Sequence, residues 1–161
     1  MNRLLIAVDR SKGSLRAVEY VAEQFAKTPE LRVTLLHVLP GLPSQFWDDG
    51  HILTKEENEA RQKVIDKWRA NEKLLVARVF QQAAEKLVLA GIDPARIETK
   101  VAASELDSTA ESILAAAKTG EYKTLVIGRN CTHPPTAHAL IGSLANTIVN
   151  HASGVTVCVV G

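Results

Sequence analysis

Short apolar segments alternate with amphipathic segments along this chain. Near-continuous apolar stretches predict five strands, at about 3–9, 31–39, 96–102, 122–128 and 154–160. Between them, apolar residues recur every three or four positions and predict four helices, at about 11–27, 54–90, 104–120 and 142–151. Strands that are apolar on both faces and alternate with helices indicate a doubly wound α/β fold with a parallel sheet.

The predicted helix at 54–90 is long for a small domain. Thr54 and Glu57 can form a capping box at its start. Residues 56–71 are mostly charged and should lie in solvent, whereas the second half carries an apolar stripe that should face the sheet: Leu75, Val79, Ala83 and Leu87. Because an unbroken helix would span about 55 Å, we expect a bend or break near 67–71.

Composition and charge narrow the class of protein. The 161 residues are 46% apolar and 23% charged, which is typical of a soluble globular chain and predicts one domain, 1–161, with the helix at about 54–90 as a charged insertion. A net charge of +1 gives no support for binding nucleic acid or an anionic membrane. The first apolar segment meets Asp9 too early for a signal peptide, and two cysteines form no disulfide framework. We therefore predict a cytoplasmic protein.

The segment from Leu125 to Ser143 has the organisation of an anion-binding site. Its apolar run ends at Gly128, and thirteen residues then separate this glycine from Gly142 and Ser143, where a helix begins. In a parallel α/β sheet, the amides of such a loop and the helix N-terminus point to one place beyond the carboxyl end of the strand. A strand-to-helix connection usually has about 2–6 residues, so the length of this loop indicates a function.

The chain resembles the universal stress protein family over nearly its whole length. The resemblance rests on five segments, at 4–11, 36–38, 125–128, 142–143 and 155–157. It implies an adenine nucleotide alpha hydrolase-like fold with five parallel strands in the order 3-2-1-4-5. It also implies an adenine nucleotide, ATP alone or with Mg²⁺, at the carboxyl ends of the first and fourth strands.

Nucleotide-binding members of that family carry the motif G-x2-G-x9-G-[S/T], whose loop wraps the phosphates of ATP. By position, Gly128, Gly142 and Ser143 match this motif, Asp9 matches the acidic residue beside the ribose, and Val38 matches the backbone contact to adenine. The resemblance thus implies the following site residues: Ala7, Val8, Asp9, Val38, Ile127, Gly128, Cys131, Gly142, Ser143 and Leu144.

The loop departs from the family motif. Cys131 replaces the second glycine, ten residues rather than nine precede Gly142, and Pro134 and Pro135 remove two amide donors. The family also contains members that lack the motif and do not bind ATP, so three functions stay open. The first is a stress-response protein that uses ATP as a regulatory switch, the second is a protein-interaction module, and the third is a slow ATPase.

An enzyme is the weakest of these three hypotheses. The sequence has no P-loop lysine, and the only candidate bases near the loop are His133 and His138. Together with Cys131 these histidines form C-x-H-x4-H, which matches no standard zinc arrangement, so we predict no metal site. Phe46 and Trp47 lie in a predicted loop, where they either contact a partner or fold back onto the domain.

Several candidate site residues also have a purely structural interpretation. Asp9 can cap the helix that follows it, Ser143 can be the N-cap of the last helix, and Gly128 can simply end a strand. His37 is predicted to be a hydrogen-bonded packing residue rather than a catalytic one.

The last predicted strand suggests an assembly. From Val155 to Val160 it is apolar and lacks proline, so at the edge of a sheet it would pair readily with another strand. Pairing with the same strand of a second copy would give a homodimer, and members of the family that the chain resembles often dimerise in this way.

Overall fold

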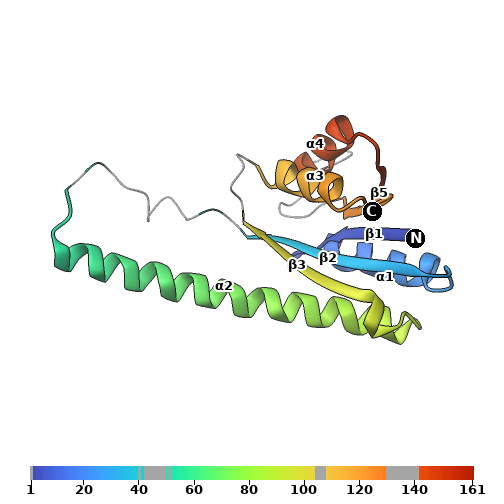
Figure 1. Cartoon of the computed structure of the whole chain (residues 1–161), viewed down its shortest axis with the longest axis horizontal. Coiled ribbons are helices and arrows are strands. Elements are labelled where there is room, and N and C mark those ends of the chain that lie inside the picture. The colour runs from blue at the N-terminus through green and yellow to red at the C-terminus, as the bar shows by residue number, and fades with distance from the viewer. Residues whose placement is uncertain (1, 40, 42–49, 51, 104–107, 130–141) are drawn as a thin grey trace.

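The computed structural model describes residues 2–39, 41, 50, 52–103, 108–129 and 142–161. Its strands form a single parallel sheet: β1 (Asn2–Ala7), β2 (Leu31–Leu39), β3 (Ile97–Ala103), β4 (Thr124–Gly128) and β5 (Thr156–Val160). Their order is β3-β2-β1-β4-β5, which confirms the predicted fold (Figure 1). The α-helices are α1 (Lys12–Phe25), α2 (Lys55–Leu89), α3 (Thr109–Thr119) and α4 (Ser143–His151), and a short 3₁₀-helix, η2 (Pro94–Arg96), precedes β3.

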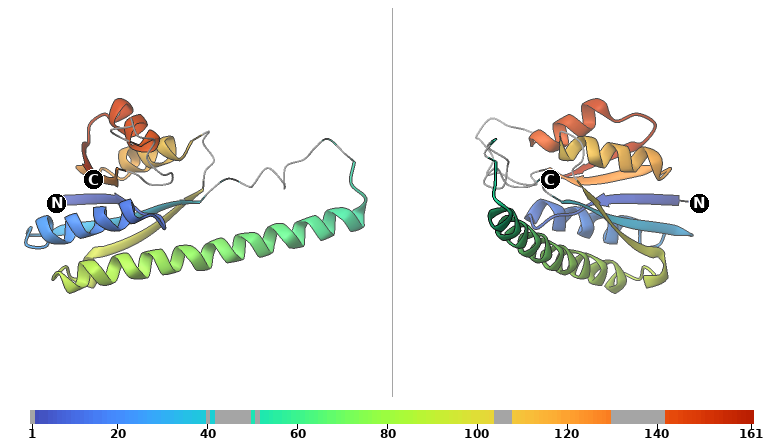
Figure 2. Two further views of the ribbon diagram at one scale, coloured as in Figure 1. Left: turned by 180° about the vertical axis from the view of Figure 1, so that it is seen from behind. Right: turned by 60° about the vertical axis from the view of Figure 1, so that its left-hand side comes forward.

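Each face of the sheet is covered by two helices. α1 and α2 lie on one face, and α3 and α4 lie on the other, as Figure 2 shows from two further sides. Alternate residues along β1 enter the two cores, with Leu4 and Ile6 beneath α1 and α2 and with Leu5 facing α3 and α4. This burial on both faces explains why the strands are apolar without alternation.

The helix ends follow ordinary capping chemistry. Ser11 caps α1, Ser108 caps α3, and Thr54 with Glu57 forms the predicted capping box of α2. α3 therefore begins at Thr109, later than predicted. Gly91, at a φ of 100°, follows the last turn of α2 in the left-handed conformation that suits glycine.

The predicted break in α2 is wrong, because one continuous helix of 35 residues runs from Lys55 to Leu89. At 1.5 Å per residue it is about 52 Å long, and its first half extends beyond the strands (Figure 1). The residues at 67–71 include neither glycine nor proline, so nothing in the backbone interrupts the helix. Ile65 is buried and Trp68 half-buried, so the inward stripe continues into the charged half.

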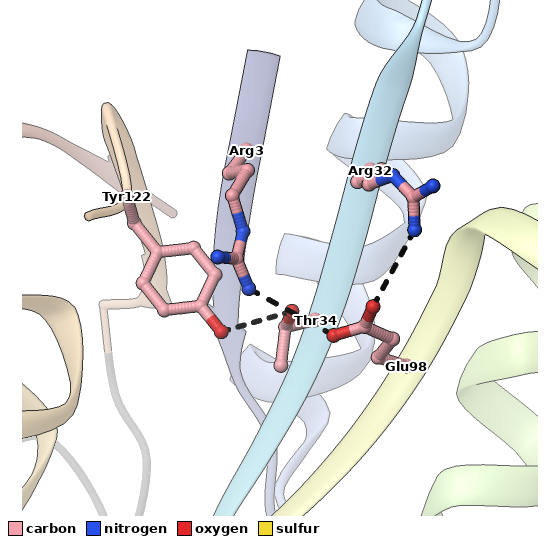
Figure 3. Close-up of polar contacts among 5 residues, drawn as sticks. All are labelled: Arg3, Arg32, Thr34, Glu98 and Tyr122. Carbon is pink, nitrogen blue, oxygen red and sulfur yellow. Dashed lines mark hydrogen bonds and ion pairs between the residues drawn. The ribbon is translucent and has the colours of Figure 1, made fainter. Parts of the chain in front are cut away.

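At the amino end of the sheet, the polar side chains bond to one another (Figure 3). The buried Tyr122 hydroxyl lies 3.0 Å from Thr34 Oγ1, and the guanidinium of Arg3 lies 4.9 Å from the centre of the tyrosine ring. Glu98 forms ion pairs with Arg3 and Arg32 at 3.9 and 3.6 Å. These contacts join β1, β2 and β3 to the residue that leads into β4.

In the described part of the chain, no helix combines the length and the hydropathy that crossing a lipid bilayer requires. α2 has the length, but charged residues occur along it.

Candidate functional site

A cleft of about 950 Å³ opens at the carboxyl end of the sheet. Its volume lies within the range of small-molecule sites, which is about 300–1,000 Å³. Residues from the ends of two strands, from the starts of α1, α3 and α4, and from the interior of α2 line the cleft. They are residues 7–11, residues 36–38, Glu72, Leu75, Val76 and Val79 of α2, residues 108–110 and Ile113 at α3, and Ser143, Leu144 and Thr147 of α4.

Three helices begin at this cleft, and they differ in how their first amides are satisfied. At α1 the Ser11 hydroxyl accepts from the Ser14 amide at 3.1 Å, and at α3 the Ser108 hydroxyl accepts from the Glu111 amide at 3.2 Å. At α4 the N-cap residue is Gly142, which has no side chain to accept such a bond. The interpretation of Ser143 as the N-cap is therefore wrong, because Ser143 is the first residue of the helix. The start of α4 thus offers amide donors and the positive end of its dipole to a ligand.

Asp9 forms a local turn and also borders the cleft. Its Oδ1 accepts from the Ser11 amide at 2.8 Å, and its own amide donates to the buried Ser14 hydroxyl at 2.9 Å. The interpretation of Asp9 as the cap of α1 is wrong, because Ser11 is the N-cap, and Asp9 bonds the amide of that cap residue instead. The two bonds of Asp9 hold its carboxylate at the rim of the cleft, where its second oxygen can accept from a ligand hydroxyl.

The two ends of the long loop lie side by side. The Gly142 amide donates to the Arg129 carbonyl at 3.1 Å, and the Arg129 amide donates to the Val160 carbonyl at 2.7 Å. The end of β4 and the start of α4 are therefore joined directly, as the anion-site interpretation requires.

Gly128 has a packing role that the sequence did not reveal. A Cβ added to it would lie 2.4 Å from the carbonyl carbon and 2.5 Å from the carbonyl oxygen of Gly13. The first turn of α1 therefore packs directly against the end of β4, and any side chain at Gly128 would push the two apart.

His37 is a hydrogen-bonded residue, as predicted, and it also lines the cleft. Its Nδ1 donates to the Val8 carbonyl at 2.7 Å, because a carbonyl oxygen can only accept. This bond joins β2 to the residue after β1 and holds the imidazole beside the cleft.

The structure divides the predicted site residues into three groups. Those that line the cleft are Ala7, Val8, Asp9, Val38, Ser143 and Leu144. Ile127, Gly128 and Gly142 are not among its lining residues. Gly142 directly precedes the lining residue Ser143 and bonds to Arg129, which follows Gly128. Cys131 lies outside the described residues, and so do Phe46, Trp47, His133, Pro134, Pro135 and His138.

Sequence reasoning missed the contribution of α2 to the site. Glu72, Val76 and Val79 form one wall, with Leu75 also facing the cleft, and Glu72 places a carboxylate among apolar neighbours. The spacing of three to four residues from Ile65 through Trp68, Glu72 and Val76 is the signal that could have identified this wall. It was hidden by the many charged residues that surround it.

Comparison with known proteins places this geometry in context. A sequence model described as the Universal stress protein family matches residues 1–160. No curated protein sequence matches the chain.

Solved structures share the fold at low sequence identity. A universal stress protein from Archaeoglobus fulgidus in complex with dAMP is 17% identical with a TM-score of 0.64, and the match covers 100% of this chain and 98% of that one. A universal stress protein in complex with cAMP is 16% identical with a TM-score of 0.64, over 99% and 96% of the two chains. Universal stress protein UspA from Lactobacillus plantarum is 20% identical with a TM-score of 0.63, over 99% and 97%.

Proposed function

This chain belongs to the universal stress protein family, and we propose that it binds an adenine nucleotide, ATP, as a regulatory switch in the stress response. The observation that carries the proposal is the start of α4. Among the residues that the structure describes, no side chain caps this helix, whereas α1 and α3, which begin at the same cleft, are both capped by serines. A phosphate is the natural acceptor for such a helix start.

The cleft has separate regions for the parts of a nucleotide. Leu36, Val38 and the wall of α2 supply apolar surface for the adenine. The Asp9 carboxylate is positioned for a ribose hydroxyl, and the amides at Ser143 and Leu144 for the phosphates. The dAMP and cAMP complexes of the two structural neighbours support this class of ligand.

The proposed role is binding rather than turnover, in the cytoplasm. Mg²⁺ would be held mainly by the phosphates of ATP, as is usual for this ion. Among the described residues no group of three or more His, Cys, Asp or Glu side chains could hold a metal ion.

The proposal includes a homodimer formed through β5. This strand lies at one edge of the sheet, and its side chains are half-buried from Val157 to Val160. A two-fold mate would pair the open edge and bury these residues. Sedimentation velocity over a range of protein concentrations tests this part, and a monomer at every concentration contradicts it.

The nucleotide proposal is tested by isothermal titration of the purified chain with ATP, with and without Mg²⁺. Any nucleotide that co-purifies is first removed by unfolding and refolding. Saturable heat with ATP is expected, whereas no heat at high micromolar protein refutes the proposal.

A second candidate, a protein-interaction module of the same fold, is favoured by one observation. Gly128 is required for packing against Gly13, so its presence is explained without a ligand. Supernatant from denatured protein, run on a nucleotide-resolving column, separates the two candidates. An adenine peak supports the switch, and its absence together with silent titrations supports the module.

A further inference from the structure

Beside the main cleft lies a second, smaller groove between α1 and α2. Its volume is about 190 Å³, several times the roughly 30 Å³ of one liquid water, which leaves room for a phosphoryl group. Leu15, Leu75 and Val79 form its apolar floor, and Arg10, Arg78 and Gln82 border it. It shares Asp9, Arg10, Leu75 and Val79 with the cleft, so the two hollows are adjacent.

Two arginines and one carboxylate, that of Asp9, line the groove, so its side chains carry a net positive charge. In the described part of the chain, ion pairs involve Arg3, Arg32 and Lys86, but neither Arg10 nor Arg78. The two guanidinium groups come from different elements, Arg10 from the residues before α1 and Arg78 from the middle of α2. Guanidinium groups bind phosphates through paired N–H donors, and the Gln82 amide can add another.

Asp9 separates this groove from the start of α4. Within the proposed function, the ribose lies at Asp9 and its 5′ phosphates point toward Ser143 and Leu144. A group attached to the 2′ or 3′ oxygen of that ribose would therefore extend toward Arg10 and Arg78.

We propose that the groove between α1 and α2 binds a second phosphoryl group carried on the ribose 2′ or 3′ oxygen of an adenine nucleotide. The groove should then favour an adenosine bisphosphate over AMP, which lacks the second phosphoryl group. This inference rests on the proposed function, since it needs an adenine nucleotide in the cleft.

The test is isothermal titration of the full chain with AMP, ATP, adenosine 2′,5′-bisphosphate and adenosine 3′,5′-bisphosphate. One bisphosphate is expected to bind about five- to tenfold more tightly than AMP, because exposed guanidinium contacts contribute up to about that factor. The isomer that gains affinity identifies the oxygen involved. Arg78→Gln should remove this gain and leave the affinity for AMP and ATP unchanged.

Arg69→Gln is the matched control, since Arg69 is also an exposed arginine of α2 but borders neither hollow. This variant should keep the bisphosphate preference. If AMP binds and neither bisphosphate binds more tightly, the groove inference is wrong while the proposed function stands. If Arg69→Gln and Arg78→Gln reduce the preference equally, the effect is general charge attraction and the groove is again refuted. If no nucleotide binds, both proposals fail.

Discussion

At the amino end of the sheet, polar side chains find their partners within the chain, whereas at the carboxyl end several polar groups face an open cleft. Tyr122 bonds Thr34 in the interior, and Glu98 is paired with two arginines (Figure 3). By contrast, Gly142 at the start of α4 has no side chain, and no other side chain in the described part of the chain caps this helix. The difference indicates that one end stabilises the fold and the other is available for a ligand. Substitutions at the two ends should therefore affect different measurements.

Gly128→Ala should give the largest effect. It is an exception to the contrast between the two ends, because Gly128 lies at the carboxyl end of the sheet and its substitution should nevertheless lower the stability of the fold. The new methyl group would overlap the Gly13 carbonyl at 2.4–2.5 Å, a backbone contact that no rotamer can relieve. We expect the free energy of unfolding to fall by about 2–3 kcal/mol, in line with overpacked sites. Urea unfolding followed by circular dichroism measures the change.

Gly41→Ala is the matched control for this prediction, since a Cβ at Gly41 would meet nothing within 4 Å. It should leave the urea midpoint nearly unchanged. An equal midpoint for Gly128→Ala and the unsubstituted chain would show that α1 can shift away from β4 without cost.

Tyr122→Phe tests the amino end alone. Removal of the hydroxyl leaves the buried Thr34 Oγ1 without the Tyr122 partner and should cost about 1–2 kcal/mol of stability. Nucleotide affinity should not change, because Tyr122 and Thr34 are not lining residues of the cleft.

A double-mutant cycle with Thr34→Val sharpens this result. If the hydroxyl pair is the cause, the double variant should be more stable than the sum of the single losses predicts, by about 1 kcal/mol. Additive losses would mean that the two hydroxyl groups do not depend on each other.

The same contrast explains how far sequence reasoning could go. The parallel sheet could be predicted because strands such as 4–8 and 125–127 are apolar on both faces, and its strand order could be predicted because the chain resembles a known family. The capping of α2 by Thr54 and Glu57 is local in sequence, so it could be predicted as well. The wall formed by Glu72 and Val76 could not, since it depends on where a long helix crosses the end of the sheet.

The predicted break in α2 failed for a related physical reason. It was inferred from the size expected of a small domain rather than from a helix-breaking residue in the chain. The packing role of Gly128 could be predicted only in part. A glycine at a strand end indicates that another group approaches the backbone closely, but the sequence does not identify that group, because Gly13 is distant in sequence.

Gly142→Asp tests the cleft end, and it should move stability and binding in opposite directions. Gly142 has a φ of −62° and a ψ of 156°, which other residues adopt readily, so an aspartate can cap α4. Stability should rise by a few tenths of a kcal/mol. ATP affinity should fall by about tenfold or more, since the carboxylate takes the amides and repels the phosphates. Thermal unfolding and isothermal titration measure the two effects.

Gly142→Asn separates the two causes of that loss, because it offers a similar cap without the charge. It should stabilise α4 comparably and weaken ATP binding less than Gly142→Asp does. Unchanged ATP affinity in both variants would exclude the start of α4 as the phosphate site.

Glu98→Gln should give the smallest effect, because not every polar contact at the amino end of the sheet contributes to stability. The ion pairs of Glu98 are long, at 3.6 and 3.9 Å, and its side chain is 48% exposed, so solvent screens both of them. We expect a loss of at most about 0.5 kcal/mol in low salt, and less as salt is added. Urea midpoints at low and high salt measure it, with Lys100→Gln on the same strand as a control for a change of surface charge. A loss as large as that of Tyr122→Phe would mean that Glu98 supports the stacking of Arg3 on Tyr122, and that the buried bond and the surface pairs form one cooperative unit.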